Sequence, residues 1–181
     1  MPAPPLPPLR PASPDRRPLA ADSKLKKVPE KLLKLTKLRT LDLSKNALGE
    51  IPEPLGGMVG MKQFNIAHNT VAALPPSLFG GWKSCEVINL SGNRLTALPE
   101  LGGMPRLKKL LLNGNALREL PESIGGCAKL EILEAKLNAL ATMCAHSLPA
   151  PLASAKSANG ADVAAAQTHD HGGLQAAQGA V

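Results

Sequence analysis

The residues that could do covalent or metal chemistry are few and far apart in this chain of 181 residues. A cysteine thiolate can act as a nucleophile or as a metal ligand, and the three cysteines stand at positions 85, 127 and 144. None of them has a base at the spacing of a nucleophile motif. Cys85 and Cys127 occupy apolar positions of a repeating pattern, so we interpret them as buried, unpaired thiols in a reducing compartment.

Histidines, carboxylates and glycines give no stronger signal. His169-Asp170-His171 could contact a metal, but no further ligand follows at a fixed spacing. Glu131 and Glu134 belong to one repeat and are interpreted as surface charge rather than as an acid–base pair. The glycine pairs of the chain precede no Lys-Ser or Lys-Thr, so they do not form a phosphate-binding loop. We therefore expect no catalytic site, no metal and no cofactor.

The stretch that organises the chain is Leu38–Pro52, with the sequence LRTLDLSKNALGEIP. Its apolar residues keep fixed distances from Asn46, and the same spacing returns around Asn69, Asn93, Asn115 and Asn138. These anchor asparagines are 23, 24, 22 and 23 residues apart. A repeat of this length indicates a solenoid, in which each unit packs only against its neighbours.

The positions within the repeat have physical reasons. Leu41 and Leu43 alternate with polar residues, which predicts a short strand with one buried face. The amide of each anchor asparagine can satisfy backbone groups at the turn after the strand, so we interpret all five as structural. Glycine pairs in the second halves of the repeats predict short helical or 3₁₀ turns. Because Phe64, Phe79 and Trp82 are the only aromatic residues, we expect an aliphatic core.

The composition divides the chain into three parts. Residues 1–18 contain eight prolines and are expected to form a disordered arm, in which residues 5–10 match an SH3-ligand pattern. Residues 19–146 hold the repeats, with a basic N-terminal cap at 19–37 followed by about five repeats. Residues 147–181 are rich in alanine and are expected to form a disordered tail.

The net charge of +7 is concentrated at the N-terminal end of the repeats. Residues 24–39 contain one glutamate and seven basic side chains, which we call the basic patch: Lys24, Lys26, Lys27, Lys31, Lys34, Lys37 and Arg39. These side chains are expected to point into solvent. The patch is either a solvated surface or a docking site for an acidic protein, an anionic membrane surface or RNA. No aromatic residues interleave the lysines to stack bases, which disfavours nucleic acid.

With the pattern LxxLxLxxNxLxxLP in view, residues 19–146 resemble the intracellular leucine-rich-repeat proteins of the Ras-group type. Residues 22–46 most resemble the opening of leucine-rich-repeat-containing protein 57 and its relatives. The resemblance implies an α/β repeat fold, a curved leucine-rich-repeat solenoid with a parallel β-sheet on its concave face and short helical or 3₁₀ turns on its convex face. It also implies protein binding without catalytic residues. No recognisable cap follows Asn138, where relatives continue, so a shortened form of a longer repeat protein is one reading.

The residues that alternate with the buried leucines should face the concave surface. In the first two repeats they are mainly polar: Thr40, Asp42, Ser44, Gln63, Asn65 and Ala67. From the third repeat on, aliphatic residues enter these positions. We predict a partner-binding patch centred on Val87, Leu111 and Ile132, with a polar rim of Asn89, Lys109, Asn113 and Glu134. The alternative is that these are ordinary exposed aliphatic residues.

The leading hypothesis is a non-enzymatic scaffold in intracellular signalling, which binds a protein partner of unknown identity on its concave face. The alternative is an electrostatic adaptor that docks on an anionic surface through the basic patch. No apolar run approaches the ~20 residues of a membrane-spanning helix, and no signal peptide is visible, so we expect a cytoplasmic protein. The uncapped C-terminal end of the array predicts a monomer or weak self-association through that end.

Overall fold

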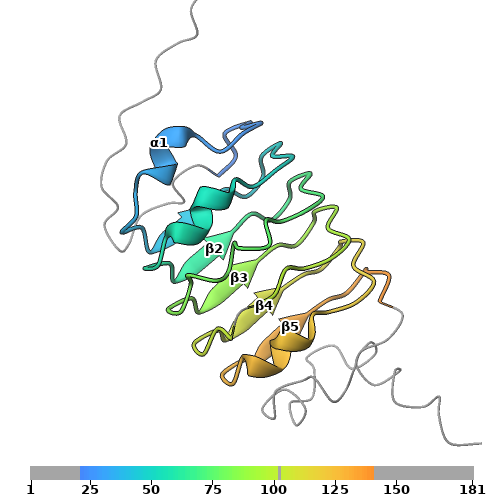
Figure 1. Cartoon of the computed structure of the whole chain (residues 1–181). Coiled ribbons are helices and arrows are strands. Elements are labelled where there is room, and N and C mark those ends of the chain that lie inside the picture. The colour runs from blue at the N-terminus through green and yellow to red at the C-terminus, as the bar shows by residue number, and fades with distance from the viewer. Residues whose placement is uncertain (1–20, 102, 141–181) are drawn as a thin grey trace, which may run out of the picture.

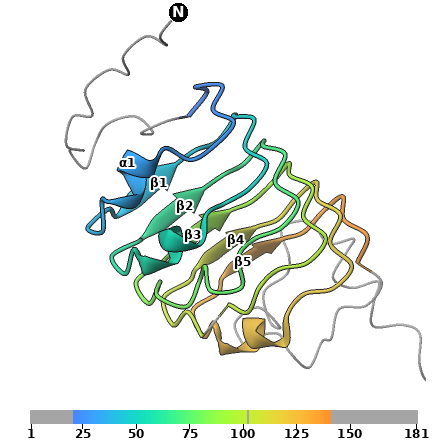
Figure 2. The ribbon, with the colours of Figure 1, turned by 45° about the horizontal axis from the view of Figure 1, so that its top comes forward.

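The computed structural model describes residues 21–101 and 103–140, which form a curved stack of parallel strands (Figures 1 and 2). The strands pair in chain order as one sheet: β1 (Thr40–Asp42), β2 (Gln63–Asn65), β3 (Val87–Asn89), β4 (Lys109–Leu111) and β5 (Ile132–Glu134). The expected solenoid is therefore confirmed. The proline-rich arm, the alanine-rich tail and residues 141–146 of the expected repeat domain lie outside the described residues.

The two-residue alternation expected from the sequence is present in every strand. The central residue of each strand is buried, while both of its neighbours are more exposed. Successive strands pair in register, so equal positions of neighbouring repeats lie side by side. The buried central residues consequently form one continuous row: Leu41, Phe64, Ile88, Leu110 and Leu133.

The five anchor asparagines form a ladder inside the array. The Oδ1 of each anchor accepts a backbone N–H from the preceding turn of the chain, and its Nδ2 donates to the carbonyl three residues earlier. In Asn93, Oδ1 lies 3.2 Å from Val71 N, and Nδ2 lies 2.9 Å from Leu90 O and 3.0 Å from Ile66 O. Each amide thus joins two repeats and satisfies backbone groups at the turn. The structural interpretation of these asparagines is confirmed.

The residue directly before each anchor has a left-handed backbone. The φ angle is 55° at Lys45, 57° at His68 and 55° at Leu137, and it is 66° at Gly92 and 64° at Gly114. Residues with a Cβ are strained in this conformation, whereas glycine is not. At Gly92 a side chain would also collide, because its Cβ would lie 2.7 Å from Nδ1 of His68. The sequence pattern did not reveal this requirement, since the residue type changes from repeat to repeat.

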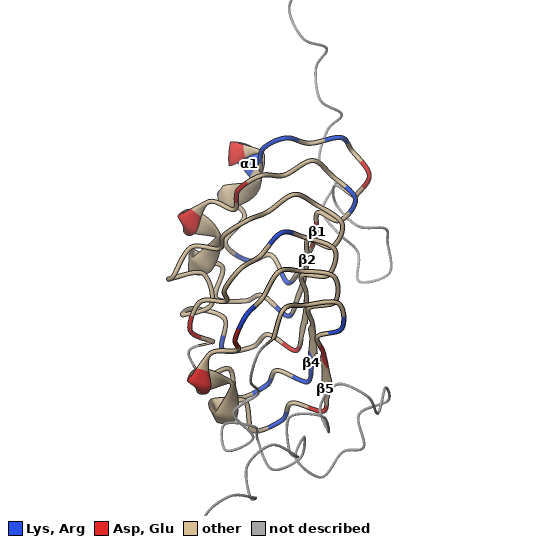
Figure 3. Cartoon of the chain, turned by 90° about the vertical axis from the view of Figure 1, so that its right-hand side faces the viewer, with Lys and Arg blue, Asp and Glu red and all other residues tan. Residues whose placement is uncertain are grey.

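The short turns expected on the convex side are present. They are α1 (Glu30–Leu33) and two 3₁₀ helices, η1 (Glu53–Gly57) and η2 (Glu122–Gly126), all on the side away from the strands (Figure 3). Successive convex turns approach closely at the glycine pairs. A Cβ on Gly81 would lie 2.5 Å from the carbonyl oxygen of Gly56. The absence of a side chain at these positions therefore lets the turns stack directly on one another.

The expectation of an aliphatic core is wrong in one region. Trp82, Phe64 and Phe79 are the largest fully buried side chains of the described residues. Trp82 makes edge-on contacts with the rings of Phe64 and Phe79, at centroid distances of 4.8 and 5.5 Å. Its indole N–H donates to the carbonyl of Leu55 at 3.2 Å, which satisfies the polar atom of a buried residue. The few aromatic residues gather in one cluster instead of being left out of the core.

The segment before β1 packs on the first repeat as a cap. The backbone N–H groups of Ser23 and Leu25 donate to Oδ1 of Asn46 at 3.0 and 2.9 Å. Val28 and Leu32 are buried against the first repeat. The cap therefore extends both the asparagine ladder and the apolar core by one turn of the chain.

Candidate functional site

Two rows of side chains cross the outer, concave face of the sheet. The first row contains the first residue of each strand in register, namely Thr40, Gln63, Val87, Lys109 and Ile132. The second row contains the third residue of each strand, namely Asp42, Asn65, Asn89, Leu111 and Glu134. Because neighbouring parallel strands lie ~4.8 Å apart, adjacent members of a row are close enough to interact.

The structure places the three aliphatic residues of the predicted patch in both rows. Val87 and Ile132 are in the first row with Lys109 between them, while Leu111 is in the second row. All three aliphatic residues are half-buried, and Lys109 is exposed. The aliphatic surface is therefore interrupted by the stem of a lysine, which can itself cover apolar area while its charge stays in water.

The second row begins as a polar series that orders its own backbone. In Asp42, Asn65 and Asn89, Oδ1 accepts the backbone N–H two residues further on, at 2.9, 3.0 and 3.1 Å. Nδ2 of Asn65 also donates to Oδ2 of Asp42 across the strands at 3.1 Å. These bonds hold the three side chains against the sheet and leave them little rotamer freedom.

Two residues that were expected to face outward are buried instead. Ser44 is 9% exposed and Ala67 is 4% exposed. The hydroxyl of Ser44 donates to Oδ1 of Asp42 at 2.6 Å, which folds the serine side chain back onto the strand. The alternation of faces therefore ends at the third strand residue in these repeats, where the chain begins to turn inward.

The polar series stops at Leu111, and a different arrangement follows on the last strand. Nδ2 of Asn113 donates to Oε2 of Glu134 at 2.7 Å, and Oδ1 of Asn113 accepts the backbone N–H of Lys136 at 2.9 Å. Asn113 and Glu134, both predicted rim residues, are thus tied to each other. They lie at the C-terminal end of the concave face.

A hollow of about 170 Å³ spans β1 to β4 on this face. Buried Leu41 and Phe64 contribute to its lining, together with Val87, Asn89 and Leu111 of the predicted patch. The remaining lining residues are Thr40, Asp42, Gln63 and Asn65. Lys109, Asn113, Ile132 and Glu134 are not part of the lining. The hollow thus joins three of the seven residues of the predicted patch to the first two repeats.

The sequence reasoning missed the four polar lining residues as site residues, although it placed them on the concave face. The predicted patch has aliphatic side chains at its centre and polar neighbours at its rim, all from the third repeat on. The signal that could have found Asp42 was present: a carboxylate and two amides, Asn65 and Asn89, recur at the same repeat position.

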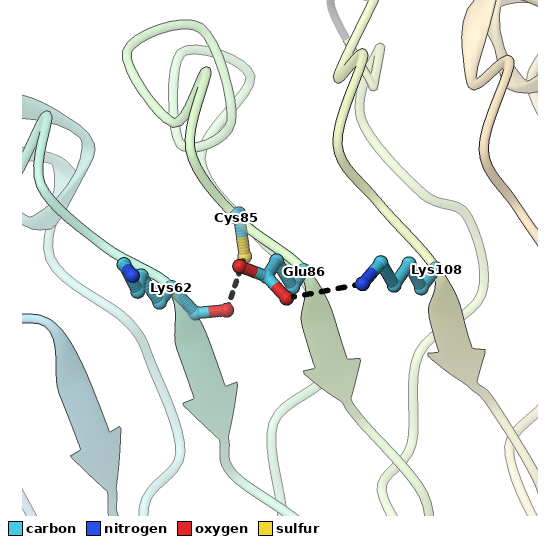
Figure 4. Close-up of polar contacts among 4 residues, drawn as sticks. All are labelled: Lys62, Cys85, Glu86 and Lys108. Atoms are coloured by element: carbon cyan, nitrogen blue, oxygen red, sulfur yellow. Dashed lines mark hydrogen bonds and ion pairs between the residues drawn. The ribbon is translucent and has the colours of Figure 1, made fainter.

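The edge of the sheet where the strands begin carries a charge pair and a thiol (Figure 4). Nζ of Lys108 lies 3.5 Å from Oε2 of Glu86. Next to this pair, Sγ of Cys85 lies 3.6 Å from the carbonyl oxygen of Lys62. Burial raises the pKa of the Cys85 thiol to about 12, and burial also raises the pKa of Cys127. Both thiols are buried and free, so they lack the thiolate character of a nucleophile or redox site.

The basic patch lies along the first turn of the array, from the segment before α1 to the residue before β1 (Figure 3). All seven of its side chains are exposed, as expected from the sequence. Nζ of Lys27 lies 3.8 Å from Oε1 of Glu50, with both side chains more than 70% exposed. A pair in such open solvent has little effect on stability.

Other candidate sites from the sequence receive no support from the described residues. Residues 21–101 and 103–140 contain no group of three or more potential metal ligands. Within the same residues, no helix has the length and apolarity needed to cross a membrane. The proline-rich motif at 5–10, Cys144 and His169-Asp170-His171 lie outside the described part of the chain.

Comparison with known families supports the repeat assignment. Two family models described as leucine-rich repeat match residues 37–58 and 60–117. Leucine-rich repeat and calponin homology domain-containing protein 1 of Mus musculus is 39% identical over 94 residues, 51% of this chain and 13% of the relative. Plant intracellular Ras-group-related LRR protein 8 of Oryza sativa is 34% identical over 117 residues, 62% of this chain and 31% of the relative.

Solved structures agree with the sequence relatives. The ectodomain of the plant membrane receptor kinase GASSHO1/SCHENGEN3 from Arabidopsis thaliana, in complex with CASPARIAN STRIP INTEGRITY FACTOR 2, has a TM-score of 0.56 and 29% identity. The match covers 64% of this chain and 14% of that chain. Among the curated relatives, the chain spans less than a third of the length of each of the first four that it matches. The repeat spacing, the asparagine ladder and these matches together identify the chain as a leucine-rich-repeat protein.

Proposed function

We propose that the chain is a non-enzymatic scaffold that binds a protein partner on its concave face. The hollow across β1 to β4 carries this proposal, because it combines half-buried aliphatic residues with fixed polar groups. Val87 and Leu111 stand where the alternation of the strands places solvent-facing side chains. An apolar centre with a polar surround is the usual composition of a partner site.

The known relatives are consistent with a binding role. Solenoids present extended concave surfaces for partners, and the similar Arabidopsis ectodomain was solved in complex with CASPARIAN STRIP INTEGRITY FACTOR 2. A leucine-rich repeat serine/threonine-protein kinase of Caenorhabditis elegans also matches, but the chain covers 4% of its length. The kinase activity of that relative therefore gives no argument for catalysis here.

The test is a paired substitution in the hollow of the full chain, Val87→Asp with Leu111→Asp. The two carboxylates should abolish partner capture while the far-ultraviolet circular dichroism and the cooperative unfolding transition are kept, since neither residue is fully buried. Val59→Asp is the matched control, because Val59 is 64% exposed and follows the convex turn η1. The control should capture the same partners as the unchanged chain.

Two outcomes would contradict the proposal. If the double variant unfolds, the two side chains belong to the core and the concave assignment is wrong. If the double variant stays folded and still captures the same partners as the Val59→Asp control, the hollow is not the binding site.

A second candidate function is docking on an anionic surface through the basic patch. The exposure of all seven basic side chains favours it. Screening by salt separates the two candidates. Binding through the basic patch should weaken steeply between 50 and ~300 mM salt, whereas binding through the hollow should change much less. Replacing Lys26, Lys27, Lys31 and Lys34 by Gln should abolish the first kind of binding and leave the second.

We place the protein in the cytoplasm, in intracellular signalling. The two described cysteines are buried free thiols, which is usual where the surroundings are reducing. The similar rice protein is named as intracellular. Imaging of a tagged full chain together with a thiol-labelling assay on unfolded protein tests this placement. Enclosure in a secretory organelle, or oxidised cysteines, would overturn it.

A further inference from the structure

We infer that the hollow binds an extended segment of a partner that carries a basic side chain and, four residues away, an aliphatic side chain. The segment crosses the strands, with its basic group at Asp42 and its aliphatic group at Leu111. This inference rests on the proposed function of the concave face and specifies the chemistry of the partner.

The charge of the hollow selects a cation. Asp42 is the one ionisable side chain among the residues of the described chain that line the hollow. Its Oδ1 accepts the backbone N–H and the hydroxyl of Ser44, and its Oδ2 accepts Nδ2 of Asn65. A carboxylate can accept about four hydrogen bonds, so Oδ2 retains room for one more donor. Since the carboxylate is already fixed by these bonds, a guanidinium or ammonium group that meets it loses little extra entropy.

The middle of the hollow offers a donor to a peptide backbone. Oδ1 of Asn89 accepts the backbone N–H of Ser91, which orients the amide. In the described residues, Nδ2 of Asn89 makes no hydrogen bond that would occupy it, unlike Nδ2 of Asn65, which donates to Asp42. Asn89 is half-buried and neighbours Leu111 in the second row. A backbone carbonyl of an extended ligand fits this donor.

The spacing follows from the register. Asp42 and Leu111 are in the same row, three strands apart. Three strand spacings of ~4.8 Å make about 14 Å, and an extended chain rises about 3.4 Å per residue. Four residues therefore cover the distance. Side chains four residues apart in an extended segment point to the same side, so both can face the hollow, while a spacing of three turns one of them away.

The experiment is a selection on the immobilised full chain from a random library of twelve-residue peptides. Enriched peptides should contain Lys or Arg four residues from Leu, Ile, Val or Met, in one fixed order. Their affinity should fall about tenfold on Asp42→Asn, which removes the charge but keeps the shape and the acceptor for Ser44. It should fall at least tenfold on Leu111→Asp. Glu119→Gln, at an exposed position outside the hollow, should bind unchanged.

Each contrary outcome has one meaning. Enriched peptides that lack the basic residue, or that bind Asp42→Asn as well as the unchanged chain, overturn the inference. If the same peptides still lose affinity on Leu111→Asp, the proposed binding face stands. If peptides bind the folded double variant, Val87→Asp with Leu111→Asp, at full affinity, this result overturns both the inference and the proposed binding face. Selection of acidic segments that bind the basic patch also overturns the inference.

Discussion

Two rows of side chains run in parallel along this molecule, and both contain asparagine. The inner row is the ladder of anchors, from Asn46 to Asn138, and its members are Asn in all five repeats. The outer row is the second row of the concave face, which contains Asp42, Asn65, Asn89, Leu111 and Glu134. The same amide chemistry is thus repeated without change inside the array and varied on its surface.

The difference between the rows separates folding from function. Each inner amide bonds to backbone groups of two successive turns of the chain, so a substitution leaves backbone groups unpaired, and at Asn69 and Asn93 these groups are buried. Each outer Asx side chain accepts one backbone N–H of its own repeat close to water. Substitutions in the outer row should therefore lower the free energy of unfolding less than substitutions in the inner row. The side chains of the outer row can consequently differ between repeats and suit a partner.

The largest effect is expected where the inner row is broken at its centre. Asn93→Ala removes the acceptor of the Val71 N–H and the donor to Ile66 O and Leu90 O, all in a buried site. With ~1–3 kcal/mol for each buried group left unpaired, the free energy of unfolding should fall by about 3 kcal/mol or more. Urea denaturation measures it. A loss below about 1 kcal/mol would mean that the ladder is dispensable.

A smaller effect is expected where the inner row reaches the edge of the sheet. Asn138 makes the same kinds of bond as Asn93, to Leu117 N and Leu112 O, but β5 has only β4 as a strand neighbour among the described residues. Asn138→Ala should therefore cost about 1 kcal/mol, because this repeat opens locally before the rest. Amide hydrogen exchange should be fastest at 130–140 within the repeats. Equal protection of this repeat and the centre would contradict the expected fraying.

The turn between the rows offers a stabilising change. Leu137 has a φ of 55° and is 84% exposed, so its backbone is strained and its side chain is not packed. Gly92 and Gly114 stand at the equivalent position of earlier repeats. Leu137→Gly should raise the free energy of unfolding by about 0.5–1 kcal/mol, which is the strain relieved less the greater freedom of glycine in the unfolded chain. Thermal unfolding checks the sign, and a lower melting temperature would contradict this reading of the turn.

The smallest effect is expected for charges that belong to neither row. Replacing Lys26, Lys27, Lys31 and Lys34 by Gln should leave the melting temperature within about 1 °C, since exposed charges contribute little to stability. The four side chains are exposed. A loss of several degrees, measured by scanning calorimetry, would show that these residues support the cap directly.

The inner row could be predicted from the sequence because its physics repeats. The apolar positions around Asn46 and the four later anchors recur in phase, and a buried amide at a turn has one plausible use. Three features could not be predicted in this way, because no residue type that recurs in every repeat marks them. The left-handed turn is occupied by Lys45, His68, Gly92, Gly114 and Leu137, so no residue type marks it.

The aromatic cluster forms within one repeat and the hollow spans four strands, and the repeat pattern shows neither contact. Trp82 fills a space between Phe64 and Phe79, which come from different convex and strand segments. Asp42 and Leu111 share the hollow only because four strands pair in register. The pattern gave the positions that face outward, but the folding back of Ser44 onto Asp42 required the geometry of the turn.

The most direct test of the separation between the two rows is the free energy of unfolding of Asn89→Ala beside that of Asn93→Ala. The two asparagines are four residues apart, one on the concave face and one in the ladder. Asn89→Ala loses a single 3.1 Å bond near solvent, so it should cost less than about 1 kcal/mol, at least 2 kcal/mol less than its neighbour. Equal losses for the two variants would contradict the account, because the concave row would then be part of the fold.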